Sequence, residues 1–159
     1  MAHELEIVNG NAQMAYVGDV PWHGLGTKVP ADLTPEQFMV KAGLDWTVEK
    51  EDILTRSGIK VKNKQALVRS SDGSILDVVG TGWNPVQNSE AFNFFEEYVN
   101  AGDMEMHTAG SLKDGQMVWA LAKTKDSFEL FNGDQTDNYF LFTNPHQFGK
   151  AINIRMTPI

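Results

Sequence analysis

The sequence contains no cysteine among its 159 residues. Without cysteine the chain forms no disulfide, thiolate metal site or iron–sulfur cluster, and it has no thiol nucleophile. The sequence also lacks an apolar run of about 18 residues, the length that spans a bilayer. Its N-terminus lacks the basic and apolar regions of a secretory signal peptide. These absences together are typical of a cytoplasmic protein with no membrane partner.

Basic residues are scarce relative to acidic ones. The chain has 13 Lys and Arg against 21 Asp and Glu, which gives a formal net charge of −8. A nucleic-acid-binding domain usually carries a basic footprint, so such a footprint would have to be a local patch here. The acidic balance equally suits a protein that binds basic protein partners.

The clearest local pattern predicts an amphipathic helix from Asn88 to about Gly102. Asn88 and Ser89 are good N-cap residues, and Glu90 complements the positive end of the helix dipole. Apolar residues recur at helical spacing, and they are Ala91, Phe92, Phe94, Phe95, Tyr98 and Val99. Because aromatic side chains bury large areas, we expect this helix to pack on a sheet.

Turn residues between alternating segments predict hairpins. Asp114-Gly115 separates a strand over 104–110 from a return strand over 117–123, and Asp72-Gly73 separates strands over 65–69 and 75–79. Further strands are predicted at 46–54, 128–131, 139–142 and 150–156, with a polar loop over 132–138. The strand over 117–123 is apolar on both sides. We therefore expect it to be covered on both faces, or on one face by something outside the chain.

The N-terminal residues 1–30 show little periodicity and are broken repeatedly by glycine and proline, so an ordered, irregular arm is expected there. A short helix should begin after Thr34, with Pro35 at its first position and Gln37 completing a capping box. Residues 31–159 are predicted to form one α+β domain. It would be a mostly antiparallel sheet built from hairpins, with the short N-terminal helix and the central amphipathic helix packed on it. The chain stops soon after a strand, so truncation at the C-terminus is expected.

Sequence motifs of known chemistry are missing. The chain has no complete dinucleotide fingerprint, no P-loop and no serine nucleophile elbow. Its four histidines are not spaced as a helical metal pair. We therefore predict no catalytic residue, metal site or cofactor. A hydrolase built on His107, with Ser111 and Asp114, remains an alternative.

Basic residues cluster in one segment, where Lys60, Lys62 and Lys64 alternate as on one strand face. Together with tryptophans that can stack on a base, they predict a single-strand-binding surface. The predicted nucleic-acid-binding residues are Lys60, Lys62, Lys64, Arg69, Trp119, Lys150, Arg155 and Trp22. The alternative is that the lysines protect sheet edges from aggregation and that Trp22 fills the core from a loop.

Several segments together resemble the phage/plasmid-like protein family, a domain of unknown function. They are residues 14–18, Pro21-Trp22-His23-Gly24-Leu25-Gly26, Val86-Gln87-Asn88-Ser89-Glu90-Ala91-Phe92, Thr108-Ala109-Gly110-Ser111-Leu112, Val118-Trp119-Ala120 and Arg155-Met156-Thr157-Pro158-Ile159. The chain departs from the family at Gln147-Phe148-Gly149, where relatives commonly have Asp-Gly.

The resemblance implies a gene carried by phages, prophages and plasmids, and it implies no established reaction. This context leads to two hypotheses for a protein in the host bacterial cytoplasm. The first is a non-enzymatic accessory protein of DNA metabolism that binds or anneals single-stranded DNA. The second is an acidic protein that binds and inhibits a host nuclease or defence system. Either hypothesis is compatible with a homo-oligomer.

Overall fold

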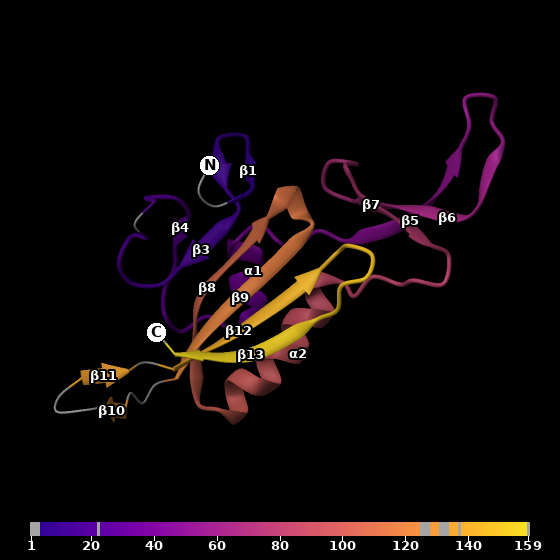
Figure 1. Cartoon of the computed structure of the whole chain (residues 1–159). Helices are drawn as coiled ribbons and strands as arrows, with labels where there is room; N and C mark the ends of the chain where they lie inside the picture. The colour runs from indigo at the N-terminus through magenta and orange to yellow at the C-terminus, as the bar shows by residue number, and fades with distance from the viewer. Residues whose placement is uncertain (1–3, 22, 125–127, 131–133, 137, 159) are drawn as a thin grey trace.

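A computed structural model describes residues 4–21, 23–124, 128–130, 134–136 and 138–158. The fold is α+β with mostly antiparallel strands, as the sequence predicts. A six-stranded sheet, here called the body sheet, forms its centre (Figure 1). In spatial order its strands are β13 (Asn153–Pro158), β12 (Asn138–Pro145), β9 (Met117–Thr124), β8 (Met104–Leu112), β3 (Met14–Tyr16) and β4 (Thr27–Lys28).

Two helices, α1 (Pro35–Lys41) and α2 (Asn88–Ala101), pack against each other and against the same face of the body sheet (Figure 1). The predicted capping box of α1 is confirmed. The Thr34 side chain accepts from the Gln37 backbone N–H, and the Gln37 side chain accepts from the Thr34 backbone N–H. The two reciprocal bonds satisfy backbone groups that the first helical turn leaves unpaired.

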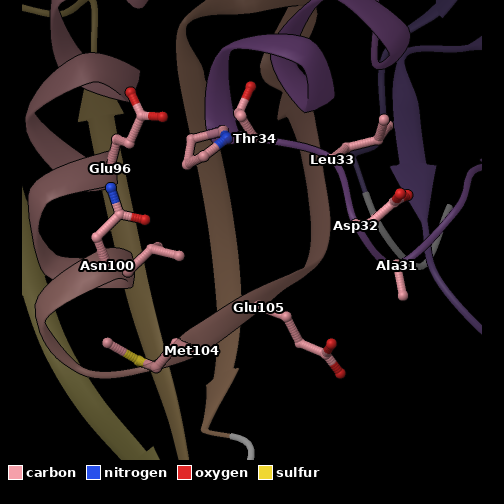
Figure 2. A pocket seen from close by; sticks show the side chains of 10 residues that line it. Ala31, Asp32, Leu33, Thr34, Glu96, Asn100, Met104 and Glu105 are labelled. Carbon is pink, nitrogen blue, oxygen red and sulfur yellow. The ribbon is translucent and has the colours of Figure 1, made fainter.

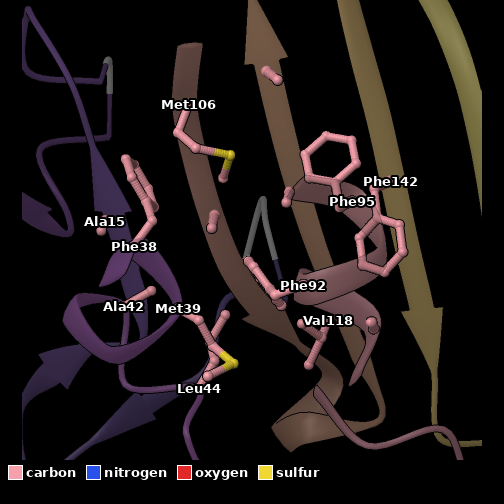
Figure 3. Close-up of a cluster of buried hydrophobic side chains, with 14 of the residues drawn as sticks. Ala15, Phe38, Met39, Ala42, Leu44, Phe92, Phe95, Met106, Val118 and Phe142 are labelled. Carbon is pink, nitrogen blue, oxygen red and sulfur yellow. The ribbon is translucent and has the colours of Figure 1, made fainter. Parts of the chain in front are cut away.

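The apolar side of α2 forms the centre of the core. Phe92 and Phe95 are fully buried and contact Phe142 of β12. The ring centroid of Phe142 lies 6.0 Å from that of Phe92 and 5.3 Å from that of Phe95. Figure 3 shows these rings between the helix and the sheet. The helix differs from the prediction at its start, where Gln87 is the N-cap residue. The Asn88 side chain points into the core instead and donates to the Leu44 carbonyl.

The N-terminal segment contributes strands that the sequence pattern did not predict. A small hairpin forms from β1 (Ile7–Val8) and β2 (Asn11–Ala12), and the buried strand β3 pairs with β8 inside the body sheet. Strands of two or three residues are too short to show an alternating pattern, which is why periodicity did not reveal them.

A second small hairpin lies between β9 and β12. It pairs β10 (Phe128–Leu130) with β11 (Asp134–Thr136), so the segment expected as a polar loop contains a strand. Residues 131–133 and 137 lie outside the described residues.

A three-stranded antiparallel sheet, here called the wing, projects from the body (Figure 1). It consists of β5 (Val48–Leu54), β6 (Lys60–Arg69) and β7 (Ile75–Gly80), and the predicted turn at Asp72-Gly73 joins β6 to β7. Val48, Leu67 and Val79 are buried near the body, whereas the far end of the β5–β6 hairpin is exposed.

A buried ion pair holds the wing to the N-terminal segment. The Arg69 guanidinium lies 2.6 Å from Glu6 and 2.7 Å from Asp72, and Arg69 and Glu6 are 4% and 3% exposed. The same guanidinium lies over the Trp46 ring at 5.2 Å. Gly115 leaves space for it, because a Cβ there would lie 2.6 Å from Arg69 Nη1. We call Glu6, Arg69 and Asp72 the clasp.

Candidate nucleic-acid interface

The body sheet has one face covered by the helices and an opposite face that we call the open face. Directly paired residues of neighbouring strands point to the same side of a sheet. Trp119 of β9 pairs with Gly110 of β8 and with Thr143 of β12. Leu121 pairs with Leu141, which pairs in turn with Arg155 of β13. The register therefore places Trp119, Leu121 and Arg155 together on the open face.

The open face carries half-buried apolar side chains where the covered face is fully buried. Val118, Ala120 and Ala122 of β9 are buried beneath the helices, whereas Met117, Trp119 and Leu121 are only partly buried. We expected β9 to be covered on both faces, or on one face by something outside the chain. In the described residues helices cover one face only, and the opposite face is partly buried.

Trp119 lies against a glycine on the neighbouring strand. A Cβ on Gly110 would lie 3.0 Å from Trp119 Cζ2, so the absence of that atom lets the indole settle onto β8. The buried Nε1 has no hydrogen-bond partner among the described residues. Packing rather than a hydrogen bond therefore fixes the ring, and its remaining exposed surface stays on the open face.

A groove of about 550 Å³ runs beside this ring. Most of its lining is apolar and comes from the body sheet and the N-terminal segment, and the residues are Leu5, Met14, His23, Leu112, Met117, Trp119, Leu141 and Thr143. A groove lined by one aromatic ring and several aliphatic side chains suits a flat, partly apolar ligand such as a nucleobase.

Cations border the open face at one end of the sheet. Arg155 is exposed and shares the row of Leu121 and Leu141. Lys123 is half-buried and lies two residues from Leu121 on β9, on the same side. Lys123 is paired across the strands with Glu105 of β8. Lys150 is exposed in the loop between β12 and β13.

The predicted lysine stripe lies elsewhere. Lys60, Lys62 and Lys64 are exposed on the projecting β5–β6 hairpin, away from the body sheet (Figure 1). The pairing of β5 with β6 shifts between Asp52 and Leu54, and Asn63 has a φ of +62°. This irregularity interrupts the strict alternation that the prediction assumed. The eight predicted residues therefore do not form one surface.

Two of the predicted residues have other positions. Arg69 is buried in the clasp, where Glu6 and Asp72 neutralise it, so it is not available to a phosphate. These contacts raise the pKa of Arg69, while burial alone would lower it, and the guanidinium stays charged. Arg69 in turn holds the pKa of Asp72 well below its ordinary value. Trp22 lies outside the described residues.

The hydrolase alternative depends on His107, Ser111 and Asp114. Ser111 is fully buried and its hydroxyl donates to Glu6 at 3.0 Å, while the ring of His107 packs on Tyr139 at a centroid distance of 5.4 Å. Among the described residues, no group of three or more His, Asp or Glu side chains is arranged to hold a metal ion.

A buried polar network near α2 was not predicted from the sequence. Asn88 Oδ1 lies 2.9 Å from His146 Nε2 and 3.4 Å from Asn144 Nδ2. Since Asn88 Nδ2 donates to Leu44, its Oδ1 is the acceptor and His146 Nε2 carries the proton. Burial lowers the pKa of His146 to about 4, so the ring is neutral near pH 7. In the sequence, the spacing of Asn144 and His146 at the end of a strand was the one feature that pointed to this network.

On the covered side, an acidic hollow of about 380 Å³ opens between the start of α1 and the end of α2. Figure 2 shows the side chains of Asp32, Glu96 and Glu105 around it, contributed by three separate parts of the chain. None of the described residues that line the hollow is cationic.

Within the described part of the chain, no helix is long and apolar enough to cross a membrane. No curated protein and no solved structure is similar enough to this chain to count as a match.

One protein family does match. Its similarity covers residues 75–159, which is more than half of the chain. The matched span runs from β7 to the end of the chain, and so includes Trp119 and Arg155 but not Lys60, Lys62 or Lys64. The chain therefore belongs to the family described as Domain of unknown function (DUF932).

Proposed function

We propose that the open face binds single-stranded DNA, and that the protein is a non-enzymatic accessory of phage or plasmid DNA metabolism in the host cytoplasm. The observation that carries this proposal is Trp119, half-buried on an uncovered sheet face that it shares with Arg155 and Lys123. Sheet-borne aromatic rings flanked by cations are a recurring way to bind unpaired bases.

Each residue has a distinct role in this proposal. The exposed side of the Trp119 ring stacks on one base, and the apolar groove beside it receives the next base or its sugar. Arg155 contacts a backbone phosphate from one sheet edge. Lys123 lies in the row beside it, directly across from Glu105 of β8. None of these contacts reads a base edge specifically, so binding is expected to tolerate many sequences.

The small number of cations sets the expected salt dependence. Neutralising about one phosphate, at Arg155, gives a slope of about −0.7 for log affinity against log salt on single strands. Stacking contributes more than charge in this arrangement, which is consistent with DNA binding by a chain of net charge −8.

Fluorescence anisotropy with a labelled single-stranded oligonucleotide at low salt tests the proposal. Trp119→Ala removes the stacking platform and is expected to weaken binding about tenfold or more, whereas Trp119→Phe retains part of it. Arg155→Glu should weaken binding and lower the salt slope. Lys62→Glu makes the same charge change on the distant hairpin and is the matched control.

Two results would contradict the proposal. One is the absence of any binding at low salt by the folded wild-type chain, as checked by circular dichroism. The other is an equal loss of affinity with Lys62→Glu and Arg155→Glu, which would move the site to the wing.

The acidic hollow favours a second candidate function, an acidic protein that inhibits a host nuclease or defence system. Asp32 and Glu96 present negative charge without a cationic neighbour among the described lining residues, as a surface for a basic protein segment requires, whereas Glu105 lies across from Lys123. Purified protein should then inhibit exonuclease activity in host lysate, and Glu96→Lys should relieve the inhibition. Glu51→Lys on the wing is the control, and lysate activity unchanged by the wild type would exclude this function.

A further inference from the structure

The far end of the β5–β6 hairpin is a basic projection on an acidic protein. We call residues 53–64 the arm. It contains Arg56, Lys60, Lys62 and Lys64 and no Asp or Glu, although the whole chain has a net charge of −8. Lys60 lies 3.6 Å from Asp52, but both side chains are exposed, and such surface pairs contribute little. Arg56, Lys62 and Lys64 have no ion-pair partner among the described residues.

The arm also exposes large aliphatic side chains. Leu54 and Ile59 are 58% and 66% exposed on either side of the hairpin turn. A two-stranded hairpin without a covering layer is only marginally stable by itself. Two exposed aliphatic side chains near its tip give it apolar surface that a partner can cover. The arm therefore combines positive charge with apolar surface, and a matching partner would combine negative charge with apolar surface.

The outer side of α2 has this complementary character. Phe94 and Tyr98 are 45% and 41% exposed, and they contact each other edge to face at 5.3 Å. Glu90 and Glu97 lie on the same side of the helix, four residues before and three residues after Phe94, and both are exposed. We call these four residues the α2 patch. No Lys or Arg occurs between Arg69 and Lys113 in the sequence, so α2 itself carries no positive charge.

The arm and the α2 patch of one chain lie apart. The arm projects away from the body, while α2 lies behind the body sheet (Figure 1). We propose that the arm of one copy docks on the α2 patch of a second copy. In this interface Leu54 and Ile59 cover the exposed rings of Phe94 and Tyr98, and the arm cations face Glu90 and Glu97.

A second copy fits both properties of the arm better than a nucleic acid does. Phosphates would neutralise the cations but would leave the aliphatic tip without an apolar counterpart, whereas the α2 patch supplies both. Because the contact joins two different surfaces, it repeats head to tail unless it closes into a ring. The arm, residues 53–64, has fewer residues than the roughly 20–30 per side of a standard interface, so we expect weak association.

Sedimentation velocity of the whole chain over a range of concentrations tests the proposal. We expect the average sedimentation coefficient to rise with concentration at low salt and to fall back in high salt. Ile59→Ser and the charge reversal Lys62→Glu on the arm, and Phe94→Ser and Glu97→Lys on the α2 patch, should each weaken association about tenfold or more. Combining Lys62→Glu with Glu97→Lys in one chain should restore part of it.

Mixing two defective chains gives the sharpest result. A chain with Ile59→Ser and Lys62→Glu keeps its α2 patch, and a chain with Phe94→Ser and Glu97→Lys keeps its arm. Each should be monomeric by itself. Together they should form a one-to-one complex that does not grow, because only one arm and one patch remain competent.

Several outcomes would overturn the proposal. The first is a wild-type chain that stays monomeric at every concentration. The second is association that the arm variants abolish but the α2 variants do not affect. A third is Lys62→Glu lowering affinity for an oligonucleotide in the anisotropy assay while self-association is unchanged, which would make the arm a nucleic-acid contact. The proposal does not depend on DNA binding by the open face, since Trp119→Ala and Arg155→Glu should leave sedimentation unchanged.

Discussion

The body sheet and the wing are both antiparallel, yet different forces hold them. The body sheet is covered on one face by aromatic side chains of α2, and Phe92, Phe95 and Phe142 are fully buried there. In the wing, burial stops near the body, and the far end exposes Leu54 and Ile59.

The clasp adds a buried ion pair to the apolar contacts at the base of the wing. Arg69 comes from the wing and Glu6 from the N-terminal segment, and Ser111 of β8 donates to Glu6. A buried charge is costly unless it is paired. The wing is therefore most stable in the position where Arg69 meets Glu6. The comparison teaches that apolar burial stabilises the body and the base of the wing, whereas the clasp adds a polar contact that favours one position of the wing.

The largest effect is expected from the body core. Phe92→Ala removes a fully buried ring that contacts Phe142 and should lower the free energy of unfolding by about 3–5 kcal/mol. Phe94→Ala on the exposed side of the same helix should cost less than about 1 kcal/mol. Urea denaturation followed by circular dichroism measures both. Equal effects from the two variants would show that α2 is not packed as described.

A somewhat smaller effect is expected from breaking the clasp. Arg69→Met leaves Glu6 buried without its cation and should lower the free energy of unfolding by about 3 kcal/mol. Asp72→Asn should cost less than about 1 kcal/mol because the Asp72 side chain is 47% exposed. Adding Glu6→Gln to Arg69→Met should recover part of the loss. If Arg69→Met were as mild as Asp72→Asn, the clasp would not be what favours one position of the wing.

The buried histidine predicts a pH dependence at the boundary between body and wing, since the His146 ring contacts Trp46 at 5.5 Å. Burial lowers its pKa from 6.5 to about 4. The unfolded chain therefore binds this proton first as pH falls, and stability decreases between pH 6.5 and about 4. The free energy of unfolding should fall by about 2–3 kcal/mol over this pH range.

The matched variant is His146→Gln, which keeps an N–H donor for Asn88 but has no ionisable group. The difference in unfolding free energy between wild type and variant should shrink as pH falls through this window. A difference that is constant from pH 7 to 4 would mean that the ring is not buried as a neutral group.

The smallest effect is expected at the tip of the wing. Ile59→Ser changes a side chain that is 66% exposed and should alter the free energy of unfolding by less than about 0.5 kcal/mol. Thermal denaturation at low protein concentration, where self-association is negligible, measures it. A loss above about 1 kcal/mol would mean that the tip contributes to the fold, and the contrast between body and wing would fail.

Local sequence patterns were sufficient for most regular elements. The period of α2, the capping box around Thr34 and the Asp-Gly turns at Asp72 and Asp114 act over a few residues, and the structure confirms each. The short strands β1 to β4 could not be predicted because strands of two or three residues show no alternation, and β3 is defined by its pairing with the distant strand β8.

The candidate site was predictable only in part. Trp119 was recognised as the aromatic ring of a strand with two apolar faces, but that pattern could not reveal which face the helices leave open. Arg69 and Lys64 look alike in the sequence, five residues apart on one strand, yet one is buried in the clasp and the other is exposed. Glu6 lies 63 positions from Arg69, so no local pattern connects them.

The sequence by itself determined the α+β class, the amphipathic helix, the hairpins and the acidic balance, because spacing and composition act locally or over the whole chain. Only the tertiary structure decided that the basic residues divide between a clasp, an arm and a sheet edge. The physical reason is that side-chain burial and charge pairing depend on which distant segments meet, and the pairing of β3, β8, β9, β12 and β13 creates those neighbours.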